Sequence, residues 1–557
     1  MPPGPRRLLV TAGTIHAGDP PRPGPTAMLI DGGRIAWTGH ADSLPGPIPR
    51  ARVDIGGAVV IPGLVDCHFH MLCLLPTAGW ADLRGVRSIA EVRRMLAMHA
   101  PRVPDGRWLV GWGFDAANAN GRHVRRDDLD AVSPDRPTLV IESSLHQGTV
   151  NSAALSVLGW GRSTPRWYGG AMARDHRGEP TGLVWERAFG VPALRAVQAD
   201  LEGATNVIAE RLRSTATDLL AQGVTHVAEA FTPPVLADAF GSTPLPLGLT
   251  MMPTSNRGIY SSPYDVLDGP KTGDGDAGLG VGHLKLISDG AERAAMCLSM
   301  PQAMRTTALT LWRALRTRDV RGVRVLSALG TRFDGGRVRS GTPHYRRHEL
   351  ADIATAALRS GFRIAIHALG NDALDTTLDA FERAREVTGI DVAGCRIEHA
   401  MFGRPRDFER AARLGLILSM QPSHAAHYAP TLRLTAMDTI FQAVPLRWAM
   451  EAGCRLAISS DGPTVSASLL ENVRTAVDRI GIEGAPVAAG QAIARDDALR
   501  AATVGGAEAC GVDDLKGSID VGKQADFVVM SGDPFDPSAR VLETWIAGVR
   551  VWSSDAA

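Results

Sequence analysis

A repeated order of elements, in which a helix, a glycine and a short apolar strand follow one another, sets the strongest limit on how this chain can fold. The clearest copy is the helical segment 349–358, which leads through a glycine into the strand 363–367. The same order recurs in segments 207–229, 408–420 and 448–459. Alternating helices and short buried strands are typical of parallel β/α units. Over roughly 400 residues they favour either a (β/α)8 barrel or a large doubly wound sheet.

Several of these strands end in a polar side chain, and the positions of these side chains decide between the two folds. A closed barrel brings the first and last strands side by side, so His68 and Asp461 can meet where barrel enzymes carry their active sites. An open sheet would leave the two residues far apart. The sequence therefore predicts an α/β fold with a (β/α)8 TIM barrel. The polar strand ends are His68 and His70, Lys285, His367, His399, His424 and Asp461.

The two ends of the chain have a different pattern, with short strands around turns, a strand-like segment at 517–519 and a hairpin signal at Asp31-Gly-Gly33. Each end is too small to bury a sound core alone. We therefore expect residues 1–62 and 505–557 to form one small β-sandwich domain built from both termini. Two separate β caps are the alternative.

The central residues 63–504 are expected to form the barrel. An excursion at about 80–200 interrupts the order of helices and strands and carries clustered tryptophans and glycine-rich loops. We expect this excursion to fold over the mouth of the barrel. It leaves the second and third barrel strands without a firm position.

The composition narrows the classes of partner. The 557 residues have a formal net charge of zero and 21% charged side chains, which indicates neither a nucleic-acid nor a membrane partner. Six scattered cysteines without a C-x-x-C pair are typical of a reduced, cytoplasmic protein. No uninterrupted apolar run approaches the ~20 residues that span a bilayer. We expect a cytoplasmic protein that acts on a small-molecule substrate.

The sequence His68-Phe-His70 predicts a metal site at the end of the first barrel strand. Side chains at positions i and i+2 of a strand share a face, and neutral imidazole is a common ligand of divalent metals. Such a pair is weak evidence alone, because it also occurs as surface or core histidines. The residues at the strand ends fit two linked metal sites, since they include four histidines, a lysine and an aspartate. We expect these sites to hold two divalent ions, and we expect the ions to be zinc.

Lys285 is the residue that separates the metal hypotheses, and it is one of only four lysines in the chain. An ammonium group buried beside two cations would be unfavourable. A neutral lysine amine can instead react with carbon dioxide to give a carbamate, an anionic ligand able to bridge two metals. Arginine stays protonated and cannot take this role. The alternative is that Lys285 pairs with Asp289 or extends to solvent.

Asp461 is the expected catalytic residue, because a carboxylate at this position can take a proton from water and pass it to a leaving amine. An N-cap role after the last strand is its alternative. Glu398 should face away from His399 by strand alternation and is expected to pack rather than ligate. Three further residues are expected to bind substrate, although each can equally be a packing or loop residue: His424, His146 and Asn151.

Nine motifs, spread in order over nearly the whole chain, resemble the family-3 branch of the amidohydrolase superfamily, a group of large metal-dependent hydrolases. The resemblance implies a distorted (β/α)8 barrel with a β-sandwich from both termini. It implies His68, His70 and Asp461 at one metal, His367 and His399 at a second, and a carboxylated Lys285 between them. The motifs are PGLVDCHFH, NSAAL, GEPTGLVWE, LKLISDGA, HALGNDA, RIEHA, SMQPSH, SSDGP and GSIDVGKQADFVVMSGDPF.

Three kinds of function follow from this pattern. The first is a binuclear enzyme that hydrolyses a C–N bond of amide type through a metal-activated hydroxide. The second is a mononuclear, deaminase-like enzyme, against which Lys285 argues. The third is a non-catalytic homologue, which would be expected to lose ligands that this chain retains. A metal-dependent isomerase or lyase on the same scaffold is a further alternative, and a homodimer is expected only by analogy with related enzymes.

Overall fold

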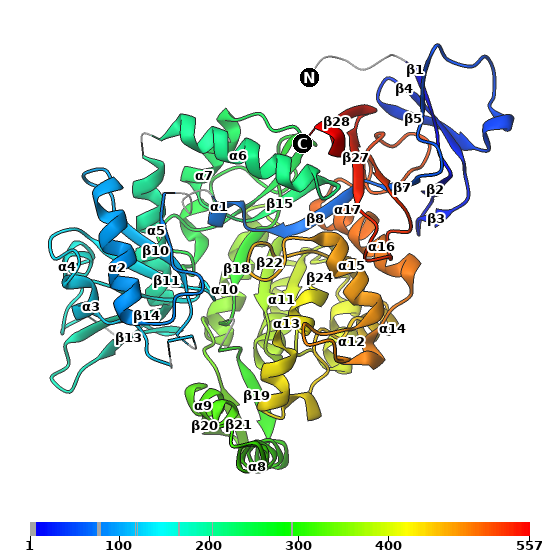
Figure 1. Ribbon diagram of the computed structural model, residues 1–557. Coiled ribbons are helices and arrows are strands. Elements are labelled where there is room, and N and C mark those ends of the chain that lie inside the picture. Colours follow the sequence, from blue (N-terminus) through cyan, green and yellow to red (C-terminus); the bar gives the residue numbers. More distant parts are fainter. Residues whose placement is uncertain are drawn as a thin grey trace.

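Two parallel β-sheets form the centre of the molecule in the computed structural model (Figure 1). The strand order is β17–β16–β15–β8 in one sheet and β18–β22–β23–β24–β25 in the other. The strands are β8 (Leu64–Phe69), β15 (Val224–Thr232), β16 (Gly248–Pro253), β17 (Leu279–Val281), β18 (Leu284–Ile287), β22 (Ile364–Ala368), β23 (Arg396–His399), β24 (Ile417–Met420) and β25 (Arg455–Ile458). The described residues are 7–74, 79–116, 118–119, 121–164, 167–202, 204–290 and 293–556.

These strands form where the sequence has short, almost uninterrupted apolar runs, as parallel strands that are covered on both faces require. All nine residues of β15 are buried, and so are all six of β8. Every pairing within the two sheets is parallel. The carboxyl ends of the strands therefore lie at the same edge, which brings residues that are far apart in sequence together.

Helices connect the strands and bury their apolar faces against them. Glu349 opens α10 with a capping arrangement, and buried Leu350, Ile353 and Leu358 lie on its inner face. Gly361, with a φ of 86°, then allows the turn into β22. The helices of this layer are α1 (Met71–Leu74), α6 (Thr205–Leu220), α7 (Pro234–Ser242), α10 (Arg347–Arg359), α11 (Asn371–Thr388), α12 (Pro405–Arg413), α13 (Pro422–Leu434), α14 (Leu446–Glu451), α15 (Leu469–Asp478), α16 (Arg495–Ala502) and α17 (Val504–Cys510). The helix–strand order predicted from the sequence is confirmed.

The two ends of the chain share one six-stranded sheet, of order β28–β27–β26–β7–β2–β3. A second sheet, β5–β4–β1–β6, shares a hydrophobic core with it that includes Leu8, Phe527 and Trp545. The predicted hairpin at Asp31-Gly-Gly33 joins β4 to β5, whereas residues 517–519 have bent, irregular backbone and not the expected strand. The strands are β1 (Arg7–Thr11), β2 (Thr14–Ala17), β3 (Arg22–Pro23), β4 (Ala27–Asp31), β5 (Arg34–Gly39), β6 (Ala51–Asp54), β7 (Val59–Pro62), β26 (Phe527–Met530), β27 (Val541–Ile546) and β28 (Val549–Ser553).

The excursion forms a sheet of its own, with the order β13–β14–β12–β11–β10–β9 (Figure 1). One face of this sheet packs on α2 and α3 around buried Leu83, Leu96 and Leu129. Glu186, directly before α5, accepts a hydrogen bond from His344, which follows β21. The elements are β9 (Ala81–Asp82), α2 (Ile89–His99), β10 (Leu109–Phe114), α3 (Arg126–Asp130), β11 (Thr138–Glu142), β12 (Gln147–Val150), α4 (Ser152–Val157), β13 (Gly170–Arg174), β14 (Pro180–Glu186) and α5 (Arg187–Leu201).

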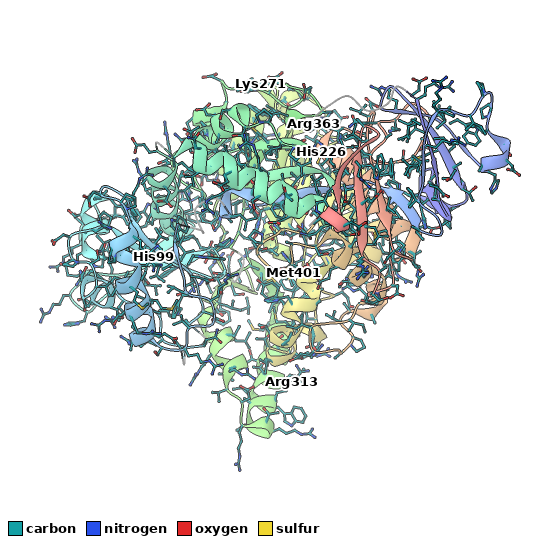
Figure 2. All side chains as sticks on the ribbon, turned by 45° about the horizontal axis from the view of Figure 1, so that its top comes forward. His99, His226, Lys271, Arg313, Arg363 and Met401 are labelled. Atoms are coloured by element: carbon teal, nitrogen blue, oxygen red, sulfur yellow. The ribbon has the colours of Figure 1, made fainter. Side chains whose placement is uncertain are left out.

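A third group of elements projects from the central strands at the bottom of Figure 1, and we call it the arm. It comprises β19 (Met296–Ser299), α8 (Met300–Thr317), α9 (Arg321–Ala328), β20 (Arg332–Asp334) and β21 (Arg337–Ser340). Arg313 of α8, labelled in Figure 2, donates to the main-chain carbonyl of Arg433 and lies 3.4 Å from Asp438. In the described part of the chain, no helix has both the length and the apolar character needed to cross a membrane.

Candidate metal centre

His68 lies at the end of β8, where it meets side chains from β23, from β18 and from the segment after β25. Its Nδ1 donates a hydrogen bond to the carboxylate of Glu398, and its Nε2 lies 3.5 Å from Asp461 Oδ1 and 3.3 Å from Lys285 Nζ. His70, two residues further along, places its Nε2 3.0 Å from the same Asp461 oxygen. The i, i+2 spacing therefore directs both imidazoles to one carboxylate, as strand geometry predicts.

Two more histidines lie near Asp461, and a third lies beside one of them. His424 Nε2 lies 3.2 Å from Asp461 Oδ2, and the His424 ring stacks on that of His399 at 5.6 Å between centroids. The His367 ring lies 4.5 Å from that of His399. Because Pro422 begins α13 directly after β24, His424 belongs to the first turn of a helix and not to the strand itself. The expected strand-end residues are thus brought together in one cluster.

The donor atoms form two groups, each with all its atoms within 4.8 Å of one another: His68, His70 and Asp461, and His399, His424 and Asp461. Asp461 belongs to both. Asp461 Oδ1 and His367 Nε2 are buried and have no well-formed hydrogen bond among the described residues, although His70 Nε2 lies 3.0 Å from the first atom and Asp289 Oδ1 3.5 Å from the second. Burial without a partner is costly for a polar atom, and a bound cation would remove that cost. The donor set of imidazoles and a carboxylate therefore fits divalent metal ions.

The protonation state of the histidines also suits metal binding. Burial lowers the pKa of His68 to about 4, and it lowers the pKa values of His367 and His399 well below their usual range, with neighbouring positive groups adding to the effect for both. His68 donates from Nδ1 to Glu398, and His399 donates from Nδ1 to the side-chain oxygen of Gln421 at 2.7 Å. Both rings therefore keep the lone pair on Nε2 for a ligand.

Lys285 is buried on β18 with only 2% of its surface exposed, so it does not extend to solvent. Burial, the largest cause, lowers the pKa of its amine to about 8, which increases the share of neutral amine at neutral pH. Asp289 is engaged elsewhere: its carboxylate accepts hydrogen bonds from the main-chain amides of Leu369, Gly370 and Ala295. The alternative in which Lys285 pairs with Asp289 is wrong, because Lys285 contacts His68 instead.

The expectation that Glu398 turns away from the site is also wrong. The Glu398 carboxylate accepts from His68 and forms a two-fold ion pair with fully buried Arg396, at 2.8 Å for both contacts. Alternation fails because His399, the last residue of β23, has a φ of 73° and turns its side chain back toward the same cluster. Glu398 thus orients a candidate ligand without being one.

His146 comes from the excursion and reaches the edge of the cluster, where its ring lies 6.1 Å from that of His367. Its Nδ1 donates to Glu186 at 2.8 Å, and His344 Nε2 donates to the same carboxylate oxygen at 3.0 Å. These two histidines hold the pKa of Glu186 down at about 2 in spite of its burial. Sequence reasoning missed Glu186 and His344, although Glu186 ends the motif GEPTGLVWE. Binding of substrate by His146 stays a prediction.

Asn151 does not line the cluster, and its expected role in substrate binding is wrong. The side chain is fully buried, and its oxygen accepts from the main-chain amides of Thr138 and Ala154 at 3.0 and 2.9 Å. Its nitrogen donates to the carbonyls of Ser133 and Arg136 at 2.7 and 2.9 Å. With these four hydrogen bonds made inside the excursion, Asn151 caps α4 and fixes the turn before it.

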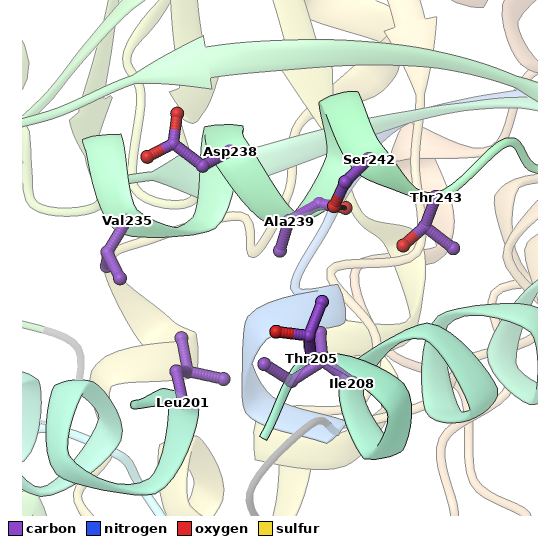
Figure 3. Close-up of a pocket in the computed structure, with 8 residues that line it drawn as sticks. All are labelled: Leu201, Thr205, Ile208, Val235, Asp238, Ala239, Ser242 and Thr243. Atoms are coloured by element: carbon purple, nitrogen blue, oxygen red, sulfur yellow. Dashed lines mark hydrogen bonds between the residues drawn. The ribbon is translucent and has the colours of Figure 1, made fainter. Parts of the chain in front are cut away.

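A pocket of about 230 Å³ lies apart from this cluster, between α7 and the facing ends of α5 and α6 (Figure 3). Its lining mixes apolar side chains with short polar ones and includes none of the histidines described above. The lining residues are Leu201, Thr205, Ile208, Val235, Asp238, Ala239, Ser242 and Thr243.

Comparison with known proteins gives consistent relatives over the whole chain. The sequence model of the amidohydrolase family matches residues 52–552. An N-substituted formamide deformylase of Arthrobacter pascens is 30% identical, over 98% of this chain and 98% of that protein. Protein LONG AFTER FAR-RED 3 of Arabidopsis thaliana is 27% identical, over 98% of this chain and 91% of its own. An uncharacterized metal-dependent hydrolase of Pyrococcus horikoshii OT3, known as a crystal structure, has a TM-score of 0.67 at 23% identity and covers 95% of this chain and 98% of its own, which shows a shared fold.

Proposed function

Because this chain belongs to the amidohydrolase family, we propose that it is a metal-dependent hydrolase that cleaves an amide-type C–N bond of a small organic substrate. One observation supports this proposal above all: His68, His70, His399 and His424, which come from three different strand ends, all surround the carboxylate of Asp461. A cluster of imidazoles around one buried carboxylate has no structural role that apolar side chains would not fill better.

The proposed ligand assignment is the one that the family resemblance implies, and the grouping of His68, His70 and Asp461 supports its first half. One divalent ion, expected to be zinc, would be held by His68, His70 and Asp461. A second would be held by His367 and His399, with Lys285 between the two ions as a carbamate. His424 is a further candidate ligand because it lies 3.2 Å from Asp461. Ions bound there would polarise a substrate carbonyl and lower the pKa of water. The reduced pKa of Lys285 supports the carbamate, because only the neutral amine reacts with carbon dioxide.

Asp461 is the proposed proton carrier of the reaction. Its carboxylate takes a proton from the attacking water and donates it to the nitrogen of the departing amine, so that carboxylic acid and amine are the products. Although burial acts to raise it, the nearby imidazoles of His424 and His70 keep the pKa of the Asp461 carboxyl well below its usual range, which supports its ionised form. His146 is proposed to contact the substrate from the excursion side, held in place by Glu186.

The proposal includes closure of the central strands into a distorted (β/α)8 barrel. The main-chain amide of Asp461 donates to the carbonyl of His68 at 2.9 Å, and that of His70 donates to the carbonyl of Gly462 at 2.8 Å. These bonds join the ends of β8 and β25, which lie in different sheets. We propose a barrel of residues 63–504 with the excursion at about 80–200, and a β-sandwich of residues 1–62 and 505–557.

Because the Arthrobacter relative is an N-substituted formamide deformylase, N-substituted formamides are the first substrates to test. The experiment combines metal analysis of purified protein with turnover of a panel of N-formyl and N-acyl amines. We expect two zinc-like ions per chain, and we expect Lys285→Ala to lose metal together with turnover. Lys523→Ala, a lysine of the terminal sheets, is the matched control and should behave as wild type.

Two alternatives on the same scaffold make different predictions. A mononuclear, deaminase-like enzyme would hold one ion and keep its activity in Lys285→Ala. A metal-dependent isomerase or lyase would convert its substrate without release of an amine, which amine-specific detection would reveal. A cytoplasmic location and the absence of a nucleic-acid or membrane partner stay proposals of the same kind.

A further inference from the structure

The arm carries a helix, α8, that covers polar side chains and exposes large apolar ones. The two fully covered side chains of α8 are threonines: Thr306 and Thr310 are 2% and 1% exposed. Their hydroxyls donate back to carbonyls one turn earlier, at 2.7 and 2.8 Å, which satisfies them inside the helix. A helix of a globular protein normally turns its apolar stripe inward. Here the apolar stripe is left outside.

The outward stripe is made of large side chains. Met304 is 66% exposed, Leu311 47%, Trp312 54% and Leu315 83%. Single exposed apolar side chains are common, but four of this size on one helix form a patch. Fully covered, they would bury roughly 500 Å² per chain, so a pair of such helices would bury roughly 1,000 Å², the lower size of a specific interface.

The spacing of the stripe fits a helix partner. Met304, Ala308, Leu311 and Leu315 follow one another at intervals of four, three and four residues, which is the spacing of a two-stranded coiled-coil seam. Read in the opposite direction, the intervals are again four, three and four. The stripe is therefore self-complementary about a two-fold axis, with Met304 opposite Leu315 and Ala308 opposite Leu311.

We propose that α8 is a dimerisation surface, on which the α8 helices of two copies of this chain pack antiparallel. Two arginines of α8 lie along one edge of this seam. Arg305 and Arg316 lie about 100–120° around the helix from Met304, so they border the seam and stay in solvent. Arg316 already covers Trp312 of its own chain at 5.2 Å. In the antiparallel pair, Arg305 also comes beside Trp312 of the second copy, where a cation–π contact is favourable.

The first test is the mass of the full-length protein in solution, measured by light scattering over a range of concentrations. We expect twice the chain mass of 59.1 kDa for wild type, and the mass of one chain for Leu311→Gln/Leu315→Gln at concentrations where wild type is dimeric. Val521→Gln/Ile482→Gln is the matched control, because these two side chains are each 66% exposed outside the arm. Retained far-ultraviolet circular dichroism shows that the variants are folded.

A second test fixes the orientation of the pair. Met304→Cys/Leu315→Cys should give a disulfide-linked dimer on mild oxidation, whereas Met304→Cys alone should not, because the two copies of residue 304 lie about 16 Å apart along an antiparallel pair. Efficient linking by Met304→Cys alone would overturn the antiparallel arrangement. A monomeric wild type, or a dimeric Leu311→Gln/Leu315→Gln variant, would overturn the dimer surface. Binding of monomeric wild type to anionic vesicles that Leu311→Gln/Leu315→Gln abolishes would assign the stripe to lipid instead.

Discussion

Removal of the Arg396 guanidinium should destabilise the protein strongly and in a pH-dependent way. Arg396 is fully buried, and its guanidinium donates to both oxygens of Glu398 and to the carbonyls of Ala509 and Cys67 at 2.8–2.9 Å. Arg396→Met keeps most of the side-chain volume but leaves a buried carboxylate without its cation. Loss of one partner of a buried ion pair costs about 3–5 kcal/mol.

The expected shift in melting temperature follows from the size of the chain. An unfolding entropy of about 2.1 cal/mol/K per residue gives roughly 1.2 kcal/mol/K for 557 residues, so the loss corresponds to about 3–4 °C. Differential scanning calorimetry measures it directly. Glu398→Gln removes the charge and keeps an acceptor for His68, so Arg396→Met/Glu398→Gln should recover more than half of the loss.

The pH dependence of stability tests whether the unpaired Glu398 carboxylate causes the loss in Arg396→Met. Arg396 is the main group that holds the pKa of Glu398 well below its usual range against burial. Without Arg396, burial should raise the folded-state pKa of Glu398 above its unfolded value. The stability of Arg396→Met should then fall further as pH rises from 5 to 8, and Glu398→Gln should remove this trend.

The matched control is Arg479→Met, because Arg479 is also fully buried but donates to the carbonyls of Val487, Val444 and Ala443. Its loss of stability should not grow between pH 5 and 8. The reasoning is refuted if Arg396→Met and Arg396→Met/Glu398→Gln melt at the same temperature, or if both arginine variants show the same pH trend.

Four further outcomes are expected. Asp461→Asn should lower kcat by about 10²–10⁴-fold with little change in circular dichroism, and a loss below tenfold would exclude it as proton carrier. Asn151→Ala should lower the melting temperature by about 2 °C through loss of a cap and orphaned main-chain groups, with kcat/KM unchanged. Burial lowers the pKa of His226 to about 3, so the free energy of unfolding should fall by about 1.4 kcal/mol for each pH unit below 6.5. Calorimetry of His226→Gln should therefore show a fall in melting temperature between pH 6.5 and 4.5 that is about 2 °C smaller than in wild type. Dialysis against a chelator should abolish turnover, and added zinc should restore it; activity that survives chelation would contradict metal dependence.

The parts of the molecule that local patterns describe could be predicted from the sequence. Apolar runs with helical or strand periodicity gave the alternating elements, and the i, i+2 spacing of His68 and His70 gave two imidazoles at one point. The six-stranded sheet of the excursion was missed, because its strands are short and it mixes parallel and antiparallel pairs whose separations along the chain have no common spacing. Glu186 and His344, which are 158 positions apart, meet only through tertiary packing, and no local signal marks such a pair.

Alternation along a strand fails at the carboxyl ends of the strands for a physical reason. His399 and Asp461 have φ values of 73° and 55°, in the left-handed region that costs a residue with a Cβ about 1 kcal/mol or more. The main-chain amide of Asp461 offsets part of this cost by its hydrogen bond to the carbonyl of His68. A backbone turned in this way directs side chains to a point that a regular strand cannot reach. The same strain that made the orientation of Glu398 unpredictable therefore brings Asp461 between two groups of imidazoles.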